Sequence, residues 1–145
     1  MIDFIASVFY LMLPAYFANM APVLVKDIHL FDFLAKPIDF GKKIKGKPIL
    51  GSHKTFRGFI FGVIFALIIA YVQHILYRYP FFSSISFINY SNWIAVGFLL
   101  GFGALFGDSV KSFFKRRVGI KPGHRFIPWD ELDYTIGSLL FISIV

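Results

Sequence analysis

The sequence contains no cysteine and few charged residues. None of its 145 residues is Cys, and Asp, Glu, Lys and Arg together make up 16% of the chain, against roughly 25% in an ordinary soluble domain. The absence of cysteine excludes disulfides, thiolate metal sites and cysteine nucleophiles. Because 57% of the residues are hydrophobic, the composition also excludes a disordered chain, a nucleic-acid-binding arm and an ordinary water-soluble globule.

The charges that are present gather in two windows, which uncharged runs separate. The first window, from Lys36 to Arg57, is strongly basic, and the second, from Asp108 to Asp133, mixes both signs. A bilayer core about 30 Å thick needs about 20 apolar helical residues. The pattern predicts one all-α domain, residues 1–145, forming a polytopic transmembrane helical bundle with two basic cytoplasmic loops. The expected spans lie at about 4–25, 58–77, 88–107 and 134–145, and the shortness of the last suggests an incomplete C-terminus.

The orientation follows from the distribution of Lys and Arg, because short basic loops stay on the cytoplasmic side. If residues 26–57 are inside, three alternating spans place residues 108–133 inside as well, and residues 78–92 outside. We therefore expect a multi-pass protein of the cell membrane with its N-terminus outside and its site facing the cytoplasm. A cleaved signal peptide is the alternative for the first run, but the chain opens Met1-Ile2-Asp3 without the basic segment of such peptides.

Polar and small residues interrupt two of the predicted spans. Asn19 places an amide at membrane depth, where it either bonds to another helix or lines a polar cavity. Gly97, Gly101, Gly103 and Gly107 form two pairs of small residues spaced four apart. That spacing is typical of close helix packing in membranes.

Candidate site residues begin where the third predicted span ends, in the segment GDSVKSFFKRR. If the helix continues through Asp108, then Lys111, Ser112 and Lys115 share its face. Carboxylate oxygens hold hard cations, and lysines neutralise phosphate charge. This stripe of four side chains, Asp108, Lys111, Ser112 and Lys115, therefore suits a metal-bound polyphosphate at the membrane surface.

Two more carboxylates open the fourth apolar run, in the segment PWDELD. Asp130 and Asp133 are spaced i, i+3 and fall on one helical face. Acidic residues in a first turn also favour the helix dipole, which is the alternative explanation. Three carboxylates around six basic residues nevertheless favour a divalent-metal site.

The first basic window adds a second phosphate-type signal, GSHKTFRG at residues 51–58. Its small residues free backbone amides, and Lys54, Thr55 and Arg57 supply further donors just before the second span. The upstream lysines are better explained by anionic lipid headgroups or by topology: Lys42, Lys43, Lys45 and Lys47.

These motifs together carry a resemblance to a known family. GDSVKSFFKRR, GIKPG and PWDELD resemble the signature of membrane CTP:lipid-phosphate cytidylyltransferases, in particular the CDP-archaeol synthase branch, which is related to bacterial CDP-diacylglycerol synthases. LPAYFAN at residues 13–19 and HKTFRG at residues 53–58 are similar to further motifs of that branch. The resemblance implies Mg²⁺-dependent transfer of CMP from CTP to a membrane lipid phosphate with release of pyrophosphate. The implied acceptor is 2,3-bis-O-(geranylgeranyl)-sn-glycerol 1-phosphate.

The resemblance also implies roles for individual residues. Asp108 and Asp130 would bind the metal and would form the catalytic group with Asp133 and Lys111. The nucleotide phosphates would contact a set of hydroxyl and basic side chains: Ser112, Lys115, Arg116, Lys121, Lys54, Thr55 and Arg57. Two features depart from the family's pattern: Glu131 between the two aspartates, and a chain that ends within the fourth span of a family resembling a five-span bundle.

The sequence is also compatible with other functions. A phosphatidate cytidylyltransferase would place a diacyl lipid phosphate at the same metal. A non-catalytic module that binds anionic lipid would depend on the lysine loop instead of the aspartates. A CDP-alcohol phosphatidyltransferase is disfavoured, because its aspartate-rich pattern DGx2ARx8Gx3Dx3D is absent. We expect CTP, a lipid phosphate and the bilayer as partners and no nucleic acid, and the sequence does not determine the oligomeric state.

Overall fold

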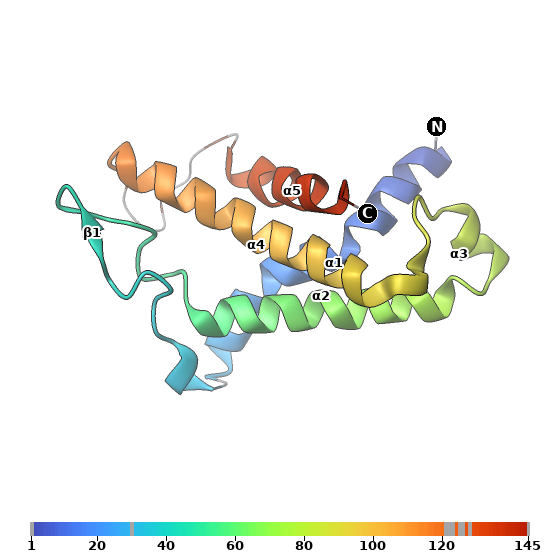
Figure 1. Ribbon diagram of the computed structural model, residues 1–145, viewed down its shortest axis with the longest axis horizontal. Helices are drawn as coiled ribbons and strands as arrows, with labels where there is room; N and C mark the ends of the chain where they lie inside the picture. Colours follow the sequence, from blue (N-terminus) through green and yellow to red (C-terminus); the bar gives the residue numbers. More distant parts are fainter. Residues whose placement is uncertain (1, 30, 121–123, 125–126, 128, 145) are drawn as a thin grey trace.

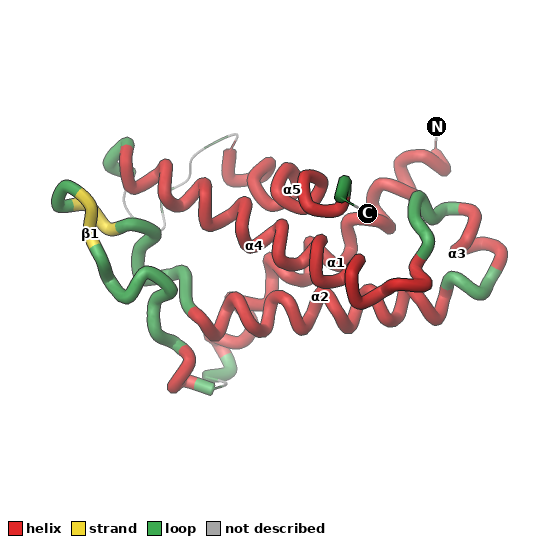
Figure 2. Tube along the Cα trace, in the orientation of Figure 1, coloured by secondary structure: helices red, strands yellow, loops and turns green. Residues whose placement is uncertain are grey.

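Long helices packed side by side dominate the computed structural model, which describes residues 2–29, 31–120, 124, 127 and 129–144 (Figures 1 and 2). The helices are α1 (Ile2–Asp27), α2 (Phe56–Leu76), α3 (Pro80–Ser84), α4 (Trp93–Arg117) and α5 (Trp129–Ile142). Two short 3₁₀ turns and a two-stranded hairpin complete the described chain: η1 (Asp32–Leu34), η2 (Tyr90–Asn92), β1 (Lys43–Ile44) and β2 (Lys47–Pro48).

The all-helical membrane fold predicted from the sequence is confirmed. Helices α1 and α2, and α4 together with η2, are long and apolar enough to cross a membrane. Helix α4 continues to Arg117, ten residues beyond the end expected for the third membrane span. This extension keeps Asp108 and the lysines after it in regular helix. The stripe expected from the spacing of these residues therefore forms.

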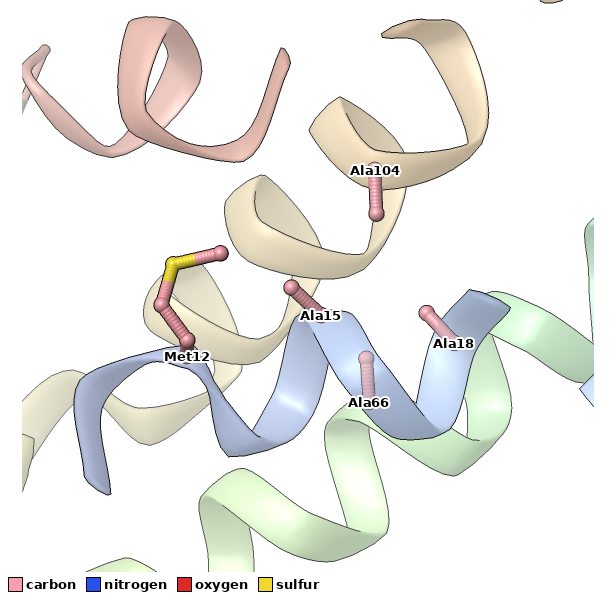
Figure 3. Close-up of a cluster of buried hydrophobic side chains, with 5 residues drawn as sticks. All are labelled: Met12, Ala15, Ala18, Ala66 and Ala104. Atoms are coloured by element: carbon pink, nitrogen blue, oxygen red, sulfur yellow. The ribbon is translucent and has the colours of Figure 1, made fainter. Parts of the chain in front are cut away.

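Small residues let the helices pack with their backbones close together. One cluster of the core between α1, α2 and α4 consists of Met12 and four alanines, Ala15, Ala18, Ala66 and Ala104, all of them buried (Figure 3). Because alanine side chains are small, the helix backbones can approach each other closely.

The four glycines of α4 divide between two neighbouring helices. A Cβ added at Gly97 would lie 2.9 Å from the Cβ of Ala70 in α2, whereas one added at Gly103 would lie 2.6 Å from the carbonyl oxygen of Gly137 in α5. Gly101 likewise faces α2, and Gly107 faces the backbone of α5. Since six residues turn a helix by about 120° from its starting face, the two pairs form two separate contact faces. The prediction of close packing is confirmed.

Proline in α1 explains a buried hydrogen bond between α1 and α2. Pro14 has no N–H to donate to the carbonyl of Tyr10, four residues earlier. The side chain of Gln73 in α2 fills this gap, because its Nε2 donates to the Tyr10 carbonyl oxygen at 2.5 Å. Gln73 is 1% exposed. An amide deep in the bundle thus satisfies a backbone acceptor that proline leaves open.

The loop between α1 and α2 folds back onto the end of α4. The guanidinium of Arg117 donates to the carbonyl oxygens of Ile44 at 2.9 Å, Lys47 at 3.1 Å and Pro48 at 2.5 Å. In return, Nζ of Lys47 donates to the Arg117 carbonyl oxygen at 2.9 Å. These bonds place the two basic windows of the sequence at the same end of the bundle (Figure 1).

A buried carboxylate shapes the base of this loop. Asp39 accepts hydrogen bonds from the backbone N–H groups of Gly41 at 2.9 Å, Leu50 at 2.8 Å and Gly51 at 3.1 Å. Burial alone would raise the pKa of Asp39, but these donors outweigh it and hold the pKa of the carboxyl below its ordinary value. Asp39 therefore fixes the course of the chain just before Lys54.

Candidate active site

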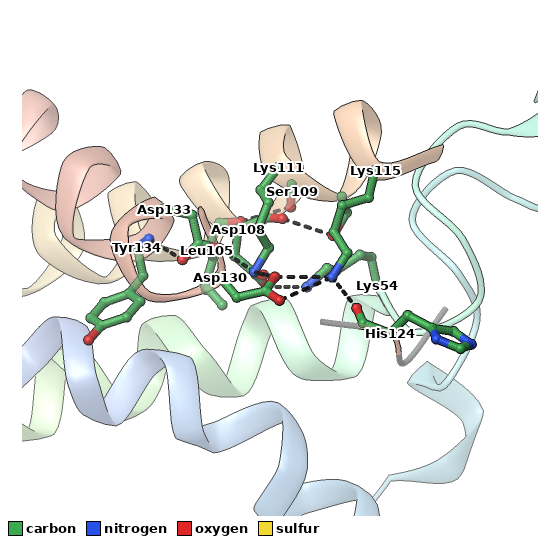
Figure 4. Close-up of polar contacts among 11 residues, drawn as sticks. Lys54, Leu105, Asp108, Ser109, Lys111, Lys115, His124, Asp130, Asp133 and Tyr134 are labelled. Atoms are coloured by element: carbon green, nitrogen blue, oxygen red, sulfur yellow. Dashed lines mark hydrogen bonds and ion pairs between the residues drawn. The ribbon is translucent and has the colours of Figure 1, made fainter. Parts of the chain in front are cut away.

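Six charged side chains meet where α4, α5 and the start of α2 come together (Figure 4). The carboxylates are Asp108 on α4 and Asp130 and Asp133 on α5, and the ammonium groups are Lys54, Lys111 and Lys115. All six are 4–24% exposed at the side chain. Burying one charge costs several kcal/mol, so a cluster of this kind persists only when its members pair. Three carboxylates against three ammonium groups satisfy this condition.

Lys111 lies at the point where the three carboxylates converge. Its Nζ is 3.1 Å from Oδ1 of Asp108, 3.1 Å from Oδ1 of Asp130 and 2.5 Å from Oδ2 of Asp133. Gly107 makes this possible, because its missing side chain lets the backbone at Asp133 rest directly on α4. One cation thus joins acidic residues from two helices.

The remaining two lysines each pair with one of these carboxylates. Lys54 contacts Oδ2 of Asp108 across the junction between the first loop and α4. Nζ of Lys115 lies 3.0 Å from Oδ1 of Asp130 and donates to the carbonyl oxygen of His124 at 2.6 Å. Each of the three carboxylates therefore has at least one ammonium partner.

A cavity of about 190 Å³ adjoins the cluster on the α4 side. Its lining residues come from α4 and the first loop: Leu50, His53, Lys54, Asp108, Lys111, Ser112, Lys115 and Arg116. Arg116 is 7% exposed, and its Nε makes no hydrogen bond among the described residues. A buried guanidinium nitrogen without a partner is costly, and an anionic ligand would satisfy it.

A second, larger cavity of about 400 Å³ lies between α1, α2 and α4. It shares His53, Lys54 and Asp108 with the first cavity. Asn19 and Thr55 also line it. The ion pair of Lys54 with Asp108 thus stands between two adjoining spaces.

The structure brings together most of the site residues expected from the sequence. Asp108, Asp130, Asp133, Lys54, Lys111 and Lys115 form the cluster, and Ser112 and Arg116 line the smaller cavity. The Thr55 hydroxyl accepts from the N–H of Gly58 at 3.2 Å and caps α2. Arg57 forms an ion pair with Asp32, and Lys121 lies outside the described residues.

Lys26 is a cavity-lining residue that the sequence analysis did not single out. It lines the larger cavity, whereas His53, which lines both cavities, belongs to the segment GSHKTFRG in which phosphate donors were expected. A single lysine in the last turn of a helix ordinarily complements the helix dipole, so its position alone did not mark it. Its spacing of seven residues from Asn19, which puts both on one helix face, was the available signal.

Fold and site together define an integral membrane protein with a buried ionic cluster suited to phosphate groups. The chain belongs to the family described as CarS-like: CDP-archaeol synthase, which it matches over residues 1–145. The family resemblance of the motifs is thereby confirmed.

Relatives and a solved structure agree with this family membership. The chain is 38% identical over 145 residues to a CDP-archaeol synthase of Archaeoglobus fulgidus, covering 99% of this chain and 77% of the relative. It is 38% identical over 138 residues to a CDP-archaeol synthase of Pyrococcus furiosus, covering 94% and 74%. A solved structure described as an intramembrane enzyme for archaeal membrane lipids biosynthesis superposes with a TM-score of 0.67 at 28% identity, covering 93% of this chain and 75% of that one.

Proposed function

We propose that this chain transfers CMP from CTP to a membrane lipid phosphate, giving a CDP-lipid and pyrophosphate. Family membership points to CDP-archaeol as the product, with 2,3-bis-O-(geranylgeranyl)-sn-glycerol 1-phosphate as the acceptor. The observation that carries the proposal is the convergence of Asp108, Asp130 and Asp133 on a single cation, Lys111. That cation borders a cavity lined by further basic groups.

The reaction demands charge neutralisation more than proton transfer. The attacking atom is an oxygen of the lipid phosphomonoester, which is already an anion near neutral pH. It forms a bond to the α-phosphorus of CTP, while the bond from that phosphorus to the bridging oxygen breaks and pyrophosphate leaves with the electron pair. Two highly negative groups must approach each other, so fixed cations and alignment supply the catalysis. A histidine base or serine nucleophile is unnecessary.

The smaller cavity supplies these fixed cations for the nucleotide phosphates. Lys111, Lys115 and Arg116 recur along one stretch of α4 and border the same space. Arg116 contributes a buried guanidinium whose Nε has no hydrogen bond among the described residues. The Ser112 hydroxyl donates to the Asp108 carbonyl oxygen at 2.9 Å, and its oxygen can still accept a hydrogen bond.

The carboxylates fit a divalent cation in donor type. Hard cations such as Mg²⁺ prefer carboxylate oxygens, and Asp108 and Asp130 both contact one cation already. Within the described part of the chain no group of three or more acidic or histidine side chains is arranged to hold a metal ion, and the ammonium of Lys111 lies among the three carboxylates. Asp108 and Asp130 would hold Mg²⁺, which supplies charge neutralisation at the departing pyrophosphate.

The distribution of charge supports a site that faces the cytoplasm. Both basic windows lie at the end of the bundle that carries the cluster (Figure 1), and basic loops stay inside. The N-terminus, at the far end of α1, would then lie outside the cell membrane.

The test is CMP transfer by the purified chain in lipid nanodiscs with labelled CTP and Mg²⁺. Archaeal and diacyl lipid phosphates are offered in parallel, and formation of the CDP-derivative of the ether lipid is expected. Asp108→Asn and Asp130→Asn should abolish transfer while the protein stays folded, and Asp3→Asn, at the opposite end of α1, should leave it intact. Transfer that survives in folded Asp108→Asn and Asp130→Asn protein would overturn the proposal. A preference for the diacyl lipid would reassign the acceptor.

A further inference from the structure

The larger cavity combines an apolar wall with a polar end. Apolar side chains from all three surrounding helices contribute to it, among them Val23 of α1, Phe59 of α2 and Leu105 of α4. The polar end contains Lys26 and the ion pair of Lys54 with Asp108. Its volume of about 400 Å³ lies in the range of small-molecule sites, about 300–1,000 Å³. This composition suits a ligand with an anionic head and apolar tails.

Four of the polar side chains that line this cavity have no partner within the described chain: Asn19, Lys26, Asp27 and His53. Asn19 makes no side-chain hydrogen bond to any described residue, although it lies eight residues inside the end of α1. At about 1.5 Å per residue that position is about 12 Å below the helix end. A polar group at such depth is tolerated where it faces a cavity that holds water or a ligand. Asn19 therefore favours the cavity interpretation over a bond between helices.

Lys26 is also unpaired, and it lies on the same face of α1 as Asn19. The separation of seven residues corresponds to about two helical turns, or about 10 Å along the axis. Lys54 is occupied by Asp108, whereas Lys26 forms no ion pair with any described residue. Asp27 also lines the cavity, one position further on, and does not pair with Lys26. The ammonium group of Lys26, near the end of α1, is thus available to pair with an anion, and the amide of Asn19 lies deeper in the bundle.

We propose that this cavity binds the acceptor lipid phosphate, with Lys26 contacting the phosphate and Asn19 donating to an oxygen of the glycerol backbone. The inference rests on the proposed CMP transfer. The shared wall of His53, Lys54 and Asp108 places the bound phosphate next to the nucleotide cavity. Val23 both lines the cavity and is 61% exposed, so the space opens there towards the bilayer. The lipid tails leave through this opening.

Protection of a single introduced cysteine tests the binding without any turnover. The chain has no cysteine of its own, so Val23→Cys provides the only thiol for maleimide labelling. A dialkylglycerol phosphate should slow this labelling, whereas dialkylglycerol without phosphate, inorganic phosphate and CTP alone should not. Val110→Cys, on an exposed position of α4, is the matched control and should label at the same rate throughout. Equal protection by dialkylglycerol, or none by the phosphate lipid, would overturn the assignment.

Two substitutions in the same background identify the contacts. Lys26→Met should raise the lipid concentration needed for half-protection by about tenfold, since it removes a charged hydrogen bond. Asn19→Leu, which keeps the size and removes the amide, should raise it by about fivefold. In the transfer assay both should increase KM for the lipid and leave KM for CTP unchanged, with Arg78→Met as a control at the opposite end of the bundle. Unchanged half-protection, or an equal rise in KM for CTP, would refute the assigned roles.

The two proposals can fail separately. Product formed without protection of Val23→Cys would overturn the lipid site and leave CMP transfer standing. Protection without any product would support the lipid site and overturn the transfer reaction.

Discussion

Gly103→Ala tests whether the spacing of α4 and α5 sets the geometry of the carboxylates. A Cβ at this position would lie 2.6 Å from the Gly137 carbonyl oxygen and 2.9 Å from Cα of Ser138, whereas ordinary carbon–oxygen contacts are about 3.3–3.6 Å. Helix α5 must therefore retreat by about 0.7–1 Å, and Asp130 and Asp133 move with it. Because a misplacement of about 1 Å costs about 100-fold in rate, we expect such a loss in kcat. Overpacking should lower the free energy of unfolding by about 1–3 kcal/mol.

Gly97→Ala is the matched control on the same helix. Its added Cβ would lie 2.9 Å from Cβ of Ala70 and 3.0 Å from Cα of Leu67, so it strains the contact with α2 and leaves α5 in place. Both variants should unfold at lower temperature in detergent, but only Gly103→Ala should lose CMP transfer at a temperature where both are folded. Full activity in Gly103→Ala, or an equal loss in Gly97→Ala, would refute the reasoning.

Three further substitutions test other parts of the structure. Lys111→Met leaves buried carboxylates without their shared cation, so in EDTA the free energy of unfolding should fall by about 3–5 kcal/mol. Mg²⁺ should restore part of this loss. If neither the substitution nor Mg²⁺ changes the unfolding temperature, the proposed role of Lys111 in the cluster is wrong. Because backbone donors lower the pKa of Asp39 despite its burial, its stabilisation is complete above about pH 4 and is lost as the pH falls through the lower folded-state value. Limited proteolysis should therefore cut the wild-type hairpin only in acid and cut Asp39→Asn at pH 7 as well, and a resistant variant would argue against this role. Gln73→Leu leaves the Tyr10 carbonyl unpaired and should cost about 1–3 kcal/mol in unfolding free energy with CMP transfer retained, so unchanged thermal stability would count against that bond.

Much of the fold was accessible from the sequence because hydropathy and small-residue spacing are local signals. Uncharged runs predicted the long helices, and the glycines of α4 predicted close packing. The spacing could not show that Gly97 and Gly103 serve different neighbours, since that depends on which helix lies on each side. Hydropathy marks where a helix leaves the apolar core and not where the helix ends, so the expected span closes at residue 107 while α4 continues to Arg117.

The site was predictable where its residues share one helix and less so across the chain. The stripe of Asp108, Lys111 and Lys115 follows from periodicity alone, and the structure shows these residues in one cluster. The contact of Lys54 with Asp108 joins positions 54 residues apart, a pairing that no local pattern encodes. Lys26 was missed for a related reason, because its significance depends on a cavity that three helices build together.

The division of the α4 glycines between two neighbours also limits how this protein can move. With one face held against α2 and another against α5 at backbone distance, α4 cannot roll about its axis without breaking both contacts. We therefore expect α4 to keep its position relative to α2 and α5 during each turnover. Entry of substrates and escape of products then fall to side chains and to the loops at the charged end of the bundle.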